Sequence, residues 1–323
     1  MDRFPVPPTH FPTPAADNMT KTRDFLGPYR LARLIRAGST SQVWEALEDA
    51  SDERVAIKLL NSKFKDDRGQ IASLKHEFAV ASDLTTSQRV VKVKEYRVEG
   101  GVPFLVMELF SELNLKQALR NGPDSIGYMI DKIVKQAAEG LHFMHEKGYV
   151  HRDVKPDNFL VSGEGMVKLI DFTISEKKKT GLAKLFHMKR KVTEGTRSYM
   201  APEQIRRQVC DERADIYSFG CVLFECVTGK PPFTGQTPDD LLSKHLSAQV
   251  PSPITSNDNV TKEFATLVKR MIAKRADDRP ESFWQFMKEF ETTEVYIKRP
   301  RKPEVSIFET GTSIKRPDDL FRN

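Results

Sequence analysis

The residues whose types could do chemistry lie in four short segments of this 323-residue chain: VAIK at residues 55–58, HRDVKPDN at 151–158, DFT at 171–173 and APE at 201–203. Asn158 and Asp171 offer amide and carboxylate oxygens, the hard ligands that Mg²⁺ prefers. Asp153 is a carboxylate, which can accept a proton at neutral pH. Lys58 follows three apolar residues, which disfavours the alternative of an ordinary surface lysine. These residue types indicate a site that handles metal, charge and protons.

In this order and at these separations, the four segments resemble the signature set of the protein-kinase superfamily. Any one of them could arise by chance, but all four in sequence are hard to explain otherwise. The resemblance runs from about Tyr29 to Phe290. YMAPEQ and the ending AKRADDRPESFWQFMKEF further resemble bacterial, eukaryotic-like (Hanks-type) Ser/Thr protein kinases. The resemblance implies transfer of the γ-phosphoryl group of ATP to hydroxyls of a protein substrate, with Mg²⁺ as the expected metal and Mn²⁺ as the alternative.

The family resemblance also implies a role for each motif residue. Asp153 would orient the attacking hydroxyl and accept its proton, and Asn158 and Asp171 would hold the metal. Lys155 matches the lysine of Ser/Thr kinases that neutralises the transferred phosphate, so its spacing favours Ser/Thr specificity.

Lys58 would contact the α and β phosphates of the nucleotide and pair with a helix glutamate. Glu77 is the best match for that glutamate, because Glu53 and Glu95 do not lie on the helix predicted around it; a solvated helix carboxylate is the alternative. The residues expected to bind nucleotide are Ile35, Gly38, Val43, Ala56, Lys58, Glu77, Glu108 and Leu160.

Two motifs depart from the family pattern. The phosphate-covering loop should read G-x-G-x-x-G-x-V, but residues 36–43 read RAGSTSQV and keep only Gly38 and Val43. Losing two glycines should stiffen the loop or lift it slightly, and weak ATP binding is the hypothesis that follows. Thr173 replaces the glycine after Asp171-Phe172, which should narrow the conformational range of the metal motif. These departures motivate an alternative function: a kinase-like scaffold or allosteric partner with weak or no catalysis. The enzyme is favoured because the lysine and carboxylates are all present.

Several further residues match family positions that support the site. His151 and Phe172 are expected to pack in an internal hydrophobic column. Glu203 and Arg279 resemble a buried ion pair that braces the larger lobe. Asp215 resembles the helix aspartate that ties down the catalytic-loop backbone.

The segment from Asp171 to Glu203 carries the candidates for regulation. Arg152 precedes the catalytic aspartate, which in the family marks kinases whose activation segment is ordered by a phosphate. Phosphorylation by the chain itself is expected from the resemblance, with Thr193 a better candidate than Thr180. Thr196, a further candidate, more closely resembles the threonine that contacts the catalytic aspartate and lysine.

The same segment contains SEKKKTGLAKLFHMKRK, with two clusters of cationic side chains. A solvated loop is the favoured interpretation. The alternative is a dock for an anionic partner such as an acidic substrate or phospholipid, and nucleic acid is not expected.

The predicted secondary structure around these residues changes once along the chain, from strands to helices. Short β-branched runs over residues 29–109 predict strands, interrupted by one helix around residues 71–84. Helical spacing follows from residue 126, including residues 216–227 and 264–272. We therefore predict an α+β, two-lobed kinase domain over residues 29–291, with a β-rich N-lobe at about 29–109 and a helical C-lobe at about 113–291.

Composition and the two ends set further bounds. Residues 1–28 are Pro-rich and predict a flexible arm, whereas residues 292–323 predict a basic tail on the surface or disordered. With 39% hydrophobic residues the chain can bury a substantial core, and a net charge of +6 is a weak clue to partners. Three cysteines read as core thiols, and no apolar run is long enough for a membrane span. A cytoplasmic location is expected.

Overall fold

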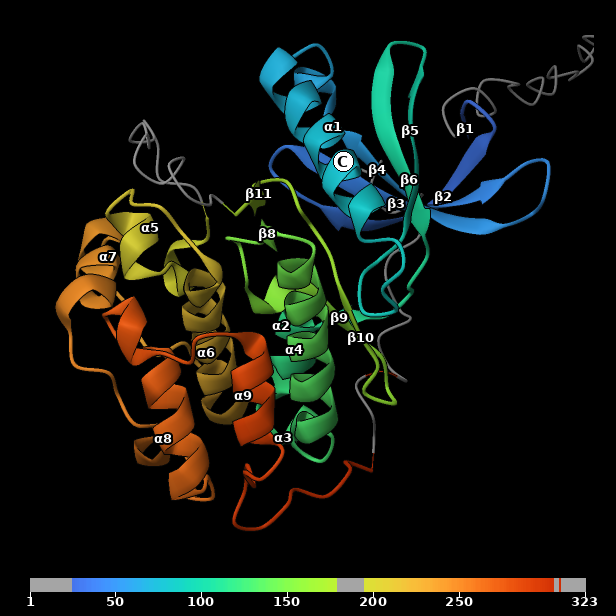
Figure 1. The fold of residues 1–323 in the computed structure, drawn as a ribbon. Coiled ribbons are helices and arrows are strands. Elements are labelled where there is room, and N and C mark those ends of the chain that lie inside the picture. Colours follow the sequence, from blue (N-terminus) through green and yellow to red (C-terminus); the bar gives the residue numbers. More distant parts are fainter. Residues whose placement is uncertain (1–24, 179–194, 305–307, 309–323) are drawn as a thin grey trace, which may run out of the picture.

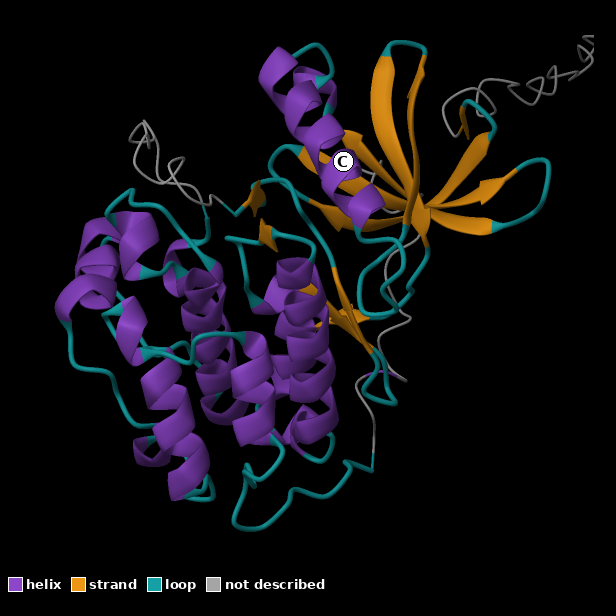
Figure 2. Cartoon of the chain, in the orientation of Figure 1, coloured by secondary structure: helices purple, strands orange, loops and turns teal. Residues whose placement is uncertain are grey.

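The computed structural model describes residues 25–178, 195–304 and 308. A lobe of strands with one long helix is joined to a lobe made mostly of helices (Figures 1 and 2). The α+β, two-lobed architecture predicted from the sequence is confirmed.

The N-lobe is built on a six-stranded antiparallel sheet whose spatial order is β1-β2-β3-β4-β6-β5. One face of the sheet packs around Tyr29, Ile57 and Phe104, which are almost fully buried. Lys58 on β4 lies opposite Val43 on β3 and Leu105 on β6, so it is held in the middle of the sheet. The strands are β1 (Phe25–Leu26), β2 (Tyr29–Ala37), β3 (Ser41–Glu48), β4 (Arg54–Leu60), β5 (Val93–Glu99) and β6 (Val102–Glu108).

Helix α1 (Arg68–Asp83) lies beside this sheet and matches the helix expected at residues 71–84. It begins where the Asp67 side chain accepts a hydrogen bond from the Gln70 backbone N–H, as an N-cap does. Leu74 and Val80 are buried on its inner side, and Glu77 is buried there with them. A buried carboxylate among apolar neighbours needs a partner, and Lys58 provides one.

The C-lobe is organised around α6 (Glu212–Thr228), which is buried along nearly its whole length. Phe219 of α6 meets Phe283 and Phe286 of α9 in edge-to-face contacts. Helix α6 is capped at its C-terminus by Gly229, whose φ of 77° is in the left-handed region that glycine adopts without strain. The other helices are α2 (Leu115–Ala118), α3 (Asp124–Gly127), α4 (Ile130–Glu146), α5 (Pro202–Ile205), α7 (Pro238–Ser247), α8 (Lys262–Met271) and α9 (Phe283–Phe290).

Two small sheets lie at the junction of the lobes, where the motif residues are. One has the order β10-β9-β7 and the other pairs β11 with β8. They hold the catalytic loop, which follows β8, and the metal motif, which follows β10. Their strands are β7 (Leu113–Asn114), β8 (Tyr149–Val150), β9 (Phe159–Val161), β10 (Val167–Leu169) and β11 (Glu176–Lys177).

The chain after α9 differs from the surface or disordered tail expected from residue 292. Val295 and Tyr296 are buried, and Tyr296 forms a bridge with Val260. Arg299 forms an ion pair with Asp131 of α4. The segment packs on the C-lobe because Val295 and Tyr296 are apolar side chains that can be buried there, while the charged residues that follow them stay at the surface.

The sequence predicted core thiols and no apolar run long enough for a membrane span, and the structure bears on both predictions. Cys221 and Cys226 are buried thiols within α6, as predicted, and Cys210 is a half-buried thiol. Among the described parts of the chain, no helix combines the length and apolar character needed to cross a membrane.

Candidate active site

A cavity of about 570 Å³ lies where the sheet meets the C-lobe. Its wall includes every residue that the sequence predicted to bind nucleotide. They come from β2, the β2–β3 turn, β3, β4, α1, β6 and β9: Ile35, Gly38, Val43, Ala56, Lys58, Glu77, Glu108 and Leu160. The structure therefore brings together residues that are up to 125 positions apart, counting from Ile35 to Leu160.

Lys58 lies at the centre of a three-residue charge cluster in this cavity. Its Nζ donates to Glu77 Oε1 at 2.8 Å and to Glu77 Oε2 at 2.7 Å. The same nitrogen lies 3.4 Å from Asp171 Oδ1. The pairing of Lys58 with Glu77, predicted from the position of the helix, is present in the structure.

Burial and mutual attraction set the ionisation of this cluster. Burial works against the charge of Lys58, but the Asp171 and Glu77 carboxylates outweigh it and raise the pKa of the lysine. Burial also opposes the charge of Asp171, yet Lys58 and the Thr173 hydroxyl hold the pKa of that carboxyl well below its usual range. Burial raises the pKa of Glu77, although Lys58 opposes the shift. Lys58 and Asp171 are therefore charged at neutral pH.

Asp153 and Lys155 lie in the catalytic loop and converge with Thr196. Lys155 Nζ donates to Asp153 Oδ2 and, at 2.9 Å, to Thr196 Oγ1. The backbone N–H and the hydroxyl of Thr196 both donate to Asp153 Oδ1 at 2.9 Å. The contact of Thr196 with the aspartate and lysine, expected from the motif, is present. A second cavity, of about 250 Å³, is lined by Asp153, Asp171 and Lys58 together.

The backbone of the catalytic loop is fixed by Asp215 of α6, which is fully buried. Its carboxylate accepts the backbone N–H groups of His151 and Arg152, both at 2.7 Å. Arg152 has a φ of 69°, a conformation that an L-residue adopts at a cost and that these bonds maintain. The His151 ring meets Phe172 edge-on at 5.7 Å, as the expected internal column requires.

Asn158 presents a free acceptor next to the metal motif. Its Nδ2 donates to the Asp153 carbonyl at 2.9 Å, whereas its buried Oδ1 has no hydrogen-bond partner among the described residues. The Ile170 N–H donates to the Asn158 carbonyl at 3.0 Å, which holds Asp171 beside it. A buried acceptor without a donor is costly in a folded protein unless a cation or water satisfies it. Asn158 and Asp171 therefore fit a Mg²⁺-type cation.

The irregular glycine loop is held in a way that the sequence did not indicate. The Gly38 N–H donates to the Ser41 carbonyl at 2.8 Å, closing the turn between β2 and β3. Asn61 Nδ2 donates to the carbonyls of Gly38 and Ser39, each at 3.0 Å. A Cβ on Gly38 would lie 3.0 Å from the Ser41 carbonyl oxygen, so a larger residue here would crowd the tight turn.

Phe308 is a second site residue that the sequence did not indicate. It lines the larger cavity and packs on the turn after β9, because a Cβ on Gly163 would lie 3.3 Å from the Phe308 Cβ. No periodic pattern marks a single phenylalanine in a basic tail.

The segment after Asp171 is partly described. Arg152 donates to the Ile174 carbonyl at 3.2 Å and forms an ion pair with Glu176 at 3.2 Å. Thr180 and Thr193, the main phosphorylation candidates, and most of the basic segment lie outside the described residues. Phosphorylation at either threonine stays a prediction, as does a dock for an anionic partner.

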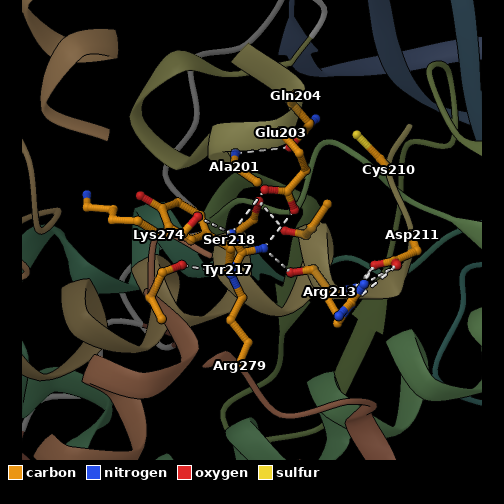
Figure 3. A network of polar contacts seen from close by, with 12 residues as sticks. Ala201, Glu203, Gln204, Cys210, Asp211, Arg213, Tyr217, Ser218, Lys274 and Arg279 are labelled. Carbon is orange, nitrogen blue, oxygen red and sulfur yellow. Dashed lines mark hydrogen bonds and ion pairs between the residues drawn. The ribbon is translucent and has the colours of Figure 1, made fainter. Parts of the chain in front are cut away.

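The ion pair expected between Glu203 and Arg279 is buried in the C-lobe (Figure 3). Two guanidinium nitrogens of Arg279 donate to the two carboxylate oxygens of Glu203, at 2.7 and 3.0 Å. Arg279 also donates to the Ala273 and Arg213 carbonyls, both at 2.8 Å. The pair therefore connects α5, which follows the activation segment, to the loop before α9 and to α6.

Comparison with known proteins gives a consistent result. Residues 29–290 match the protein kinase domain. The chain is 34% identical over 261 residues to serine/threonine-protein kinase PknH of Mycobacterium bovis, which is 80% of this chain and 43% of that protein. It is 32% identical over 251 residues to PknL of Mycobacterium tuberculosis, which is 78% of this chain and 62% of PknL. A probable serine/threonine-protein kinase of Clostridium acetobutylicum is 31% identical over 252 residues, 78% of this chain and 37% of that protein.

The chain thus spans less than half the length of the PknH relative, but the domain match covers most of the chain itself. With the lysine, glutamate and aspartates of the family motifs brought to one cleft, the chain belongs to the protein kinase family.

Proposed function

We propose that this chain is an ATP-dependent protein kinase that phosphorylates serine or threonine residues of protein substrates. The observation that carries the proposal is that Lys58, Asp153 and Asp171 line one cavity, directly beside the larger cavity that holds the predicted nucleotide residues. Phosphoryl transfer requires a cation for the phosphates, metal ligands and a base near one another.

The cavity suits ATP in shape and charge. Apolar side chains of Ala56 and Leu160 and the half-buried Ile35 would contact the base, while Lys58 would reach the α and β phosphates. Glu77 keeps the ammonium of Lys58 in place through two hydrogen bonds. Asn158 and Asp171 would hold Mg²⁺, or Mn²⁺ with similar ligands, and the metal would neutralise charge on the phosphates.

Asp153 would act on the substrate hydroxyl. In the transfer, the hydroxyl oxygen forms a bond to the γ-phosphorus, the bond from that phosphorus to the β–γ bridging oxygen breaks, and the hydroxyl proton passes to Asp153. Lys155, which is bonded to Asp153, would neutralise charge on the phosphoryl group as it moves.

The preference for serine and threonine rests on Lys155 and Thr196. Their side chains bond to each other and to Asp153, so they limit the space beside the base where the acceptor hydroxyl must enter. The names of the similar mycobacterial proteins support the same acceptor class.

The test is to incubate the purified chain with labelled ATP, Mg²⁺ and a general protein substrate, and then to identify the labelled amino acids after hydrolysis. The proposal predicts phosphoserine and phosphothreonine in the substrate or in the chain itself. Phosphotyrosine alone would overturn the acceptor class, and no transfer with either Mg²⁺ or Mn²⁺ would overturn the proposal.

A further inference from the structure

Thr173 occupies the position after Asp171-Phe172, and its hydroxyl lies between two carboxylates. Thr173 Oγ1 is 2.6 Å from Asp171 Oδ1 and 3.0 Å from Glu77 Oε2. A glycine at this position would have no side chain to make either contact. The backbone is also accommodating, because Thr173 is absent from the described non-glycine residues with positive φ, so a branched side chain fits without strain there.

The charges around this hydroxyl are unbalanced. Lys58 supplies one ammonium, while Glu77 and Asp171 supply two carboxylates, and Glu77 is 3% exposed. Two carboxylates that share one cation repel each other, and burial makes this repulsion more costly. A hydroxyl between them has one proton, so it donates to one carboxylate at a time and still separates their charges. Hydrogen bonds from hydroxyls to ionised carboxylates are short and strong, in agreement with the 2.6 Å distance.

A neighbouring contact joins the same two pieces of chain. His76, the residue before Glu77 on α1, has its Nε2 2.7 Å from the Ser175 carbonyl oxygen. Thr173 thus contacts Glu77, and Ser175 contacts the preceding residue of α1, His76. The helix that carries the lysine partner is therefore attached to the segment that carries the metal ligand, and one of the two attachments depends on the Thr173 side chain.

We propose that Thr173 is a positioning residue that ties α1 to the metal motif through its hydroxyl and so maintains the Lys58–Glu77 pair in the nucleotide-free protein. The inference rests on the proposed function for the roles of Glu77 and Asp171, but the contact itself is a property of the folded chain. Without the hydroxyl, the polar contacts that join this part of α1 to residues 171–175 are the His76 contact and the Lys58 pair.

The experiment is hydrogen exchange of the nucleotide-free protein, followed by mass spectrometry of peptides from α1. Thr173→Val keeps the branched shape and removes the hydroxyl, Thr173→Ser keeps the hydroxyl, and Thr173→Ala removes both the hydroxyl and the branch. We expect α1 to exchange about tenfold faster in the Val and Ala variants and at close to the original rate in the Ser variant. Peptides from α6, in the core of the C-lobe, serve as the internal control for global folding.

Unchanged α1 exchange in both Thr173→Val and Thr173→Ala would overturn the proposal. Equal loss of protection in Thr173→Ser and Thr173→Val would also overturn it, since the methyl group and not the hydroxyl would then matter. Phosphate transfer is measured on the same samples, and serine is expected to restore the kcat that valine lowers. If the variants show the expected exchange pattern but the original chain transfers no phosphate, the proposed function is wrong. The proposal that Thr173 connects α1 to the metal motif would still stand.

Discussion

Asn158 donates its amide nitrogen to the Asp153 carbonyl at 2.9 Å, while its buried amide oxygen meets no donor among the described residues. The orientation of this side chain is therefore set by the residue proposed as the base. This orientation leaves the Asn158 amide oxygen available beside Asp171, and a metal ligand needs such an available oxygen. Base and metal ligand are thus coupled through one side chain.

Replacing Asn158 with alanine should weaken metal binding. We expect Asn158→Ala to raise the Mg²⁺ concentration needed for half-maximal transfer at least about tenfold, because one of the two proposed ligands is lost. Transfer rates over a Mg²⁺ series measure this. Asn257→Ala is the control, since Asn257 also donates to a backbone carbonyl, that of Val227, but lies outside the site. The same Mg²⁺ dependence in both variants would count against the ligand role.

The ring of Phe308 should contribute to nucleotide affinity, because it forms part of the cavity wall. Phe308→Ala is expected to weaken ATP binding about threefold to tenfold, the loss that corresponds to part of a buried aromatic side chain. Calorimetric titration with a non-hydrolysable ATP analogue measures it. Ile297→Ala changes an apolar residue of the same segment that is 73% exposed, and it should bind like the original chain. Equal affinities for all three proteins would show that the ring does not act on the nucleotide.

Removing one partner of the Glu203–Arg279 pair should be strongly destabilising. Arg279→Ala removes the hydrogen bonds that Arg279 donates to one carboxylate and three backbone carbonyls, and we expect a loss of about 3–5 kcal/mol in the free energy of unfolding. Arg213→Ala, which breaks ion pairs with Asp211 and Asp277 nearer the surface, should cost about 1 kcal/mol or less. Denaturant unfolding gives both values, and similar losses would contradict the assignment of Arg279 as the brace.

Stability should fall in mild acid because of His245, which is fully buried beside Tyr217 and Phe233. Burial, with a smaller effect of Lys274, lowers the pKa of His245 from 6.5 to about 4. Between these values the unfolded chain binds a proton at this residue that the native chain does not, so lowering the pH favours unfolding. The expected loss approaches about 1.4 kcal/mol per pH unit over this window.

Denaturant unfolding from pH 7 to pH 4.5 tests this sign. The chain with His245→Gln should show a shallower fall than the original chain over the same range. If both chains lose stability with the same slope, His245 is not the residue that titrates.

The motif residues could be predicted because each is defined by a few contiguous neighbours. Lys58 follows three apolar residues, and Asp153 and Asn158 lie in one eight-residue motif, so the resemblance of these short segments to the kinase motifs identifies them. Glu77 was predictable because it lies on the predicted helix, whereas Glu53 and Glu95 do not. The two lobes followed from the change in periodicity.

The remaining contacts depend on how distant segments meet. The Thr173 hydroxyl reaches Glu77 because α1 packs against the metal motif. From the sequence, Thr173 predicted only a narrower range of backbone conformations and not this hydrogen bond. Phe308 reaches the cavity after the chain has crossed the C-lobe, with Val295 and Tyr296 buried on the way. No local pattern encodes such contacts, because each joins residues far apart in sequence.

The role of Asp153 is tested by comparing the original chain with Asp153→Asn in the transfer of labelled phosphate from ATP with Mg²⁺. Asparagine keeps the shape of the side chain but cannot accept the hydroxyl proton, so transfer should fall at least about a hundredfold while ATP binding is retained. Loss of transfer with retained binding is the predicted result. Transfer by Asp153→Asn at the rate of the original chain would contradict the central claim that Asp153 acts on the substrate hydroxyl.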